Sequence, residues 1–115
     1  MVADHGSVNA SAIALVTKLK VTPQENDTSR SLTATGEKHL EHLRGLKGMA
    51  FDTAYVDNDV AYHETVLKTI ESVLIPNAKN TELKAMLVNV QATFVGHLEH
   101  AKHVQAYLAA QATSR

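Results

Sequence analysis

The pattern that most constrains this chain is a pair of long apolar seams whose residues recur at steps of three and four. One seam consists of Val56, Val60, His63, Leu67, Ile70 and Leu74. The other consists of Leu83, Leu87, Val90, Phe94, His97, Ala101, Val104 and Leu108. This spacing places each set on one face of an α-helix and predicts that both faces pack against other helices.

Each seam contains one histidine, His63 in the first and His97 in the second. An imidazole at a core-facing position costs desolvation free energy unless its ring nitrogens find partners. We therefore expect each of these histidines to have either a structural hydrogen bond or a part in site chemistry.

Four helical segments are predicted, over residues 2–20, 29–47, 50–75 and 81–112. The third is expected to stop at Pro76, because proline cannot continue a helix, and Thr81 is the expected N-cap of the fourth. No stretch alternates apolar and polar residues in the manner of a strand. Short connections between helices favour neighbours that run in opposite directions, so the predicted fold is all-α, an up-down antiparallel four-helix bundle.

The two shorter segments have stripes of their own. The first carries His5, Val8, Ala12, Leu15 and Leu19. The second has the apolar positions Leu32, Leu40, Leu43 and Leu46.

Composition narrows the classes of protein to consider. The 115 residues suit a single domain, residues 1–115. The net charge of −1 without a basic cluster predicts no nucleic-acid partner. The chain has no run of 18 apolar residues, so we predict no membrane-spanning segment. The lack of cysteine excludes zinc–thiolate sites and thiol nucleophiles.

The midpoints of the two seams are expected to lie at similar depth in such a bundle, which brings His63 and His97 into one layer. His5, on the stripe of the first segment, is the third candidate. Three converging imidazoles suit zinc, copper or nickel. Distances of about 3–4 Å between their ring nitrogens would fit ligation of one ion.

The alternative is a structural or interaction module in which these histidines only pack and form hydrogen bonds. Asp59 lies one helical turn before His63 and is placed to orient its ring. The remaining histidines are expected on solvated polar faces: His39, His42, His100 and His103. An enzyme is the third hypothesis, because no glutamate begins a Glu-x-x-His pattern and no nucleophile has a recognisable base.

Five short motifs occur in a fixed order, namely residues 2–5 (VADH), 20–23 (KVTP), 51–56 (FDTAYV), 63–64 (HE) and 94–98 (FVGHL). In this order they resemble a bacterial family, domain-of-unknown-function family 4142, whose members are often labelled predicted outer-membrane proteins. The resemblance covers nearly the whole chain.

The resemblance implies a ferritin-like helical bundle in the bacterial envelope, with a periplasmic setting. The family's recurring histidines would correspond to His5, His63 and His97. The family usually has aspartate before its second histidine, where this chain has Tyr62, and this departure weakens any carboxylate role at that position. It also implies that the chain lacks the N-terminal signal and first helix of the full-length protein.

The stripes of the four segments all need partner surfaces, and a groove left by a missing helix would expose apolar side chains. We therefore predict a homo-oligomer in which a second copy covers that groove. Light scattering should show self-association that diminishes when an N-terminal helix is added to the chain. A strictly monomeric chain at high concentration that binds no apolar dye would contradict this prediction.

Overall fold

Long helices without strands build the molecule, which we describe from a computed structural model covering residues 1–115. They are α1 (Val2–Leu19), α2 (Asp27–Arg44), α3 (Gly48–Thr69) and α5 (Thr81–Thr113). A π-helical turn (Ile70–Leu74) and the short α4 (Ile75–Asn77) extend α3 before the chain reverses. The expectation of an all-α helical bundle is confirmed. None of the helices has the length and apolar character needed to cross a membrane.

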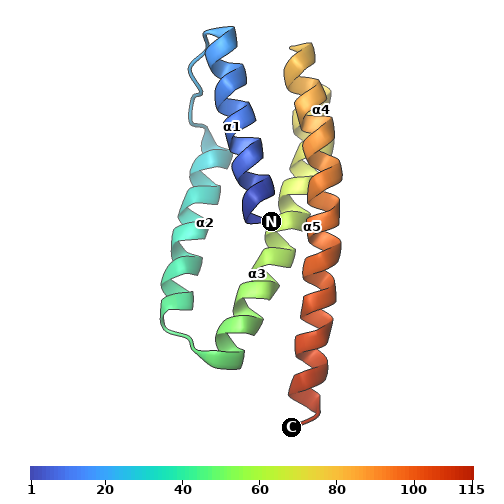
Figure 1. The fold of residues 1–115 in the computed structure, drawn as a ribbon. Helices are drawn as coiled ribbons and strands as arrows, with labels where there is room; N and C mark the ends of the chain where they lie inside the picture. Colours follow the sequence, from blue (N-terminus) through green and yellow to red (C-terminus); the bar gives the residue numbers. More distant parts are fainter.

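The pair formed by α3 and α5 is the frame of the molecule (Figure 1). The chain runs upward through α3, reverses direction after α4, and runs back downward as the longer α5, which lies beside α3. α1 packs on α5 and α2 packs on α3, whereas α1 and α2 do not pack on each other. The result is an elongated molecule of 55 × 26 × 25 Å, and the amino-terminal end of α1 lies near its middle (Figure 1).

The core lies between the two predicted seams. Leu67 and Ile70 pack against Val90 and Phe94, and these four buried side chains form one cluster. Val60, His63, His97 and Ala101 are buried as well. The periodicity therefore identified the faces along which α3 and α5 pack, because burial of one apolar stripe is what stabilises a helix pair in water.

The π-helical turn corrects the prediction at the end of the first seam. Leu74, expected in the core, is 42% exposed, whereas Ile75 packs against the core cluster. A π turn contains more residues than an α turn, so it rotates the following residues about the helix axis. Pro76 does not stop the helix where predicted, because it falls in the first turn of α4, where a missing N–H costs little.

Side-chain caps fix two helix starts differently from the prediction. α2 begins two residues earlier than expected, because Asn26 and Ser29 form a reciprocal capping box. Asn80, not Thr81, caps α5 by accepting a hydrogen bond from the backbone N–H of Leu83. On α2, Leu43 is buried as predicted, but Leu40 is exposed.

We predict that Leu67→Ala destabilises the protein by about 2–5 kcal/mol, because it opens a cavity in the core cluster. Leu67 is only 7% exposed, whereas Leu40 is 55% exposed, so Leu40→Ala is the matched control and should cost far less. Denaturant unfolding of both variants measures the difference. Equal destabilisation would contradict the placement of the core between α3 and α5.

Candidate metal centre

Three histidines from three different helices meet near the middle of the molecule. His5 is on α1, His63 on α3 and His97 on α5. Their ring centroids lie 5.8 Å apart for His5 and His63, 5.0 Å for His5 and His97, and 5.7 Å for His63 and His97. One ring nitrogen from each residue can be chosen so that all three atoms lie within 4.8 Å of one another. The structure thus brings together the three residues selected from the sequence.

His63 is held by the preceding turn of its own helix. Its Nδ1 lies 2.8 Å from the carbonyl oxygen of Asp59 and 3.1 Å from the side-chain oxygen Oδ1 of the same residue. A carbonyl oxygen can only accept, so Nδ1 must carry the proton and donate. In the neutral ring the other nitrogen, Nε2, then has a free lone pair. This Nε2 is buried and has no hydrogen-bond partner.

His97 is held through its other ring nitrogen, Nε2, by a residue on another helix. Its Nε2 donates to Oδ2 of Asp4, on α1, over 2.7 Å. This hydrogen bond, together with the nearby amino terminus, lowers the pKa of Asp4, so the carboxylate is ionised and accepts. In the neutral form of the His97 ring the proton is therefore on Nε2, and the lone pair is on Nδ1. That Nδ1 is also buried without a partner.

His5 completes the group and is the most accessible of the three, being half-buried. Burial is the main reason that the pKa of His5 is lowered, and the neighbouring His97 and His63 lower it further. A lowered pKa keeps the ring neutral at pH 7, which is the form that binds a metal ion.

Phe94 closes the group on one side. Its ring centroid lies 4.8 Å from that of His5 and 5.9 Å from those of His63 and His97. Because Phe94 belongs to the buried core cluster, this wall is apolar and excludes water. The unpartnered nitrogens of His63 and His97 therefore have neither protein nor bulk water to bond on that side.

Three imidazole nitrogens suit an ion such as zinc, copper or nickel. Each buried histidine gives one N–H to an oxygen and leaves one lone pair free, which is the arrangement typical of metal-binding histidines. The 4.8 Å limit on the donor separations is somewhat wider than the expected 3–4 Å. Bonds of about 2.0–2.1 Å to one ion would require the three rings to move toward a common point.

Sequence reasoning found one of the two supporting carboxylates and missed the other. Asp59 orients His63 as expected, and it places a carboxylate beside this ring, which the neighbouring Tyr62 cannot supply. No role was predicted for Asp4. Its hydrogen bond to His97 joins residues 93 positions apart, and a pattern of neighbouring residues cannot predict such a pair. The adjacency of Asp4 and His5 was the only signal available.

Most of the remaining histidines lie on exposed faces as predicted, namely His42, His100 and His103. His39 departs from the prediction, because it is half-buried and its Nε2 has no partner. It lines a cavity between α2 and α3 that also borders Asp59 and Tyr62.

The lowered pKa of His5 predicts a pH dependence of stability. Folding then reduces proton binding by His5, so its contribution to stability decreases as the pH falls below the unfolded value of about 6.5. The groups that face it are His63, His97, Asp59 and the amino terminus. Denaturant melts should show that His5→Gln loses less stability than the native protein between pH 7 and pH 5. His103→Gln, on an exposed face, is the control, and equal losses in all three proteins would contradict the prediction.

Comparison with known proteins assigns the chain to a family. No curated protein and no solved structure is significantly similar to it. Residues 1–104, which include all three histidines and both carboxylates, match the family described as Domain of unknown function (DUF4142). The chain belongs to this family.

Proposed function

We propose that this protein binds one divalent transition-metal ion, zinc, copper or nickel, through His5, His63 and His97. One observation carries the proposal: Nε2 of His63 and Nδ1 of His97 are buried lone pairs without partners, beside a third histidine. A buried polar atom without a partner costs about 1–3 kcal/mol, and a bound ion would remove that cost at both nitrogens.

The alternative is a structural or interaction module in which the histidines only pack. Such a role needs both nitrogens of each buried ring to be satisfied, or the ring to be replaced by an apolar side chain. In His63 and His97 only one ring nitrogen has a hydrogen-bond partner, Asp59 and Asp4 respectively, and this favours the metal site. These carboxylates would also balance the charge of a divalent ion.

We further propose that the protein acts in the bacterial envelope, in the periplasm or in association with the outer membrane. The resemblance of its motifs to family members labelled as outer-membrane proteins supports this setting. The antiparallel pairing of α3 with α5 supports an up-down four-helix arrangement (Figure 1). The resemblance of the motifs supports a bundle of the ferritin-like kind. Self-association remains part of the proposal, because several apolar side chains such as Ile13 and Val88 are exposed.

Equilibrium dialysis against zinc, copper and nickel salts tests the proposal. The native protein should bind one ion per chain, and His63→Gln or His97→Gln should abolish this binding. Asp4→Asn and Asp59→Asn should weaken it by about 10–100-fold, because they disturb the residues that orient the ligands. Asp57→Asn is the matched control, since Asp57 accepts a hydrogen bond from Gln105 away from the histidines.

Thermal melts with and without a chelator separate the two hypotheses. Metal at 100 times its dissociation constant should stabilise the native protein by about 2.7 kcal/mol, and the chelator should remove this stabilisation. His63→Leu should be insensitive to both additions. If the native protein melts identically under all conditions and His63→Leu is as stable or more stable, the structural role is correct and the metal site is not.

A further inference from the structure

The cavity between α2 and α3 is a second place where polar side chains gather around an open space. Its volume is about 290 Å³, close to the size of about 300 Å³ at which small-molecule sites begin. The lining residues all belong to these two helices, from Leu32 on α2 to Tyr62 on α3. None of them is one of the three histidines of the candidate metal centre, so the cavity is formed independently of those ligands.

The wall on α3 places a carboxylate between two phenol rings. Asp59 follows Tyr55 by four residues and precedes Tyr62 by three, so the three side chains share one face of the helix. Asp59 contacts His63 through Oδ1 over 3.1 Å, which leaves Oδ2 for another donor. Tyr55 and Tyr62 are 53% and 45% exposed, so both rings have surface available to a ligand.

The wall on α2 is mainly apolar and has space at its centre. Leu32, Leu40 and Leu43 line it, and Gly36 lies between them. A Cβ atom at Gly36 would meet no other atom within 4 Å. His39 belongs to the same wall, and its Nε2 is buried without a partner. A neutral imidazole accepts a hydrogen bond at its unprotonated nitrogen, so a ligand with an N–H group would satisfy it.

The charge of the lining selects the class of ligand. No lysine or arginine lines the cavity, and Asp59 is its one acidic residue. A carboxylate without a cationic partner attracts a positive charge, and the faces of tyrosine rings attract cations as well. The cavity therefore favours a cation that can donate hydrogen bonds and disfavours an anion.

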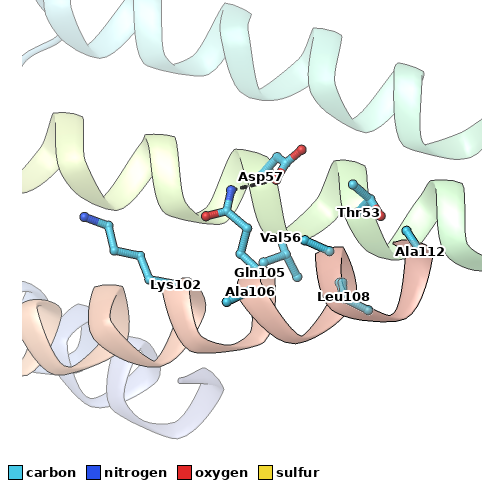
Figure 2. Close-up of a pocket in the computed structure, with 9 residues that line it drawn as sticks. Thr53, Val56, Asp57, Lys102, Gln105, Ala106, Leu108 and Ala112 are labelled. Atoms are coloured by element: carbon cyan, nitrogen blue, oxygen red, sulfur yellow. Dashed lines mark hydrogen bonds between the residues drawn. The ribbon is translucent and has the colours of Figure 1, made fainter. Parts of the chain in front are cut away.

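Asp57, the neighbouring carboxylate on α3, has different surroundings. It lies in the groove between α3 and α5, where it accepts a hydrogen bond of 2.7 Å from Gln105 (Figure 2). Lys102 lines the same groove and supplies a positive charge there. That groove therefore lacks the combination found around Asp59, and Asp57 provides a matched control.

We propose that the cavity between α2 and α3 binds a small primary ammonium ion with a single positive charge and an apolar tail. The ammonium group donates to Oδ2 of Asp59 between the rings of Tyr55 and Tyr62, and the tail packs against the leucines of α2. This proposal does not depend on the metal site, and its test is made in the presence of a chelator, so that no bound ion contributes.

Three ligands of the same shape and different charge test the class. Protein labelled with ¹⁵N is titrated with 2-phenylethylamine, 2-phenylethanol and phenylacetate, and amide chemical shifts are followed by NMR. The ammonium ligand should shift the amide signals of Gly36 and Tyr62 in a saturable manner. Its dissociation constant should be lower than that of the alcohol by about tenfold, because the alcohol lacks the ion pair and the cation–π contacts. Phenylacetate should bind more weakly still.

Two pairs of variants test the place of binding. Asp59→Asn should weaken binding of the amine to the level of the alcohol, whereas Asp57→Asn should bind it as the native protein does. Gly36→Leu fills the cavity and should abolish binding, and leucine is a better helix former than glycine. Gly96→Leu is its matched control, because Gly96 is also an open helical position and does not line the cavity.

Several results would overturn the proposal. Alcohol or phenylacetate binding as tightly as the amine would overturn the assignment of a cation. No saturable shift with the amine, or an unchanged response in Gly36→Leu, would overturn the site itself. Because Asp59 also contacts His63, Tyr62→Leu gives an independent decision if Asp59→Asn does not fold. It should weaken amine binding, whereas Tyr107→Leu, at an exposed position of α5, should not.

Discussion

The packing of α3 against α5 is the constraint on which the rest of the molecule depends. Burial of the two apolar seams fixes the rotation of each helix about its axis, and this rotation turns His63 and His97 toward the same interior layer. Neither histidine can turn toward water without exposing its whole stripe. Burial of apolar surface thereby determines that these two polar rings face the interior, although the hydrophobic effect itself has no directional preference.

Hydrogen bonds then convert this placement into a defined chemistry. The carbonyl and carboxylate of Asp59 select the tautomer of His63, and the carboxylate of Asp4 selects that of His97. These contacts leave the two lone pairs inside the layer. A site assembled in this way needs few rearrangements to receive an ion, because the rings of His63 and His97 are already oriented.

α1 is attached differently from the other helices and completes the site. It contains no buried residue, and its polar links to α5 lie near its two ends, between Asp4 and His97 and between Lys18 and Glu82. The second link is an exposed ion pair and contributes about 0–1 kcal/mol. The position of His5 therefore depends on the hydrogen bond of Asp4 and on the packing of Val8 against the core cluster, and an ion shared with α3 and α5 would add a further link between α1 and these helices.

The sequence predicted the parts of the structure that rest on regular repetition. Steps of three and four identified the buried faces of α3 and α5 and selected all three histidines, because helix geometry is the same at every turn. It did not predict the π turn that exposes Leu74, since no residue type specifies such a turn. Nor did it predict the contact of Asp4 with His97, which exists only after α1 has docked on α5.

Crystals of the zinc-loaded protein, measured at the zinc absorption edge, test the central claim most directly. The account predicts one anomalous peak at about 2.0–2.1 Å from Nε2 of His63, from Nδ1 of His97 and from a ring nitrogen of His5. Absence of density among these three rings, with zinc found only at exposed histidines such as His42 or His103, would contradict it.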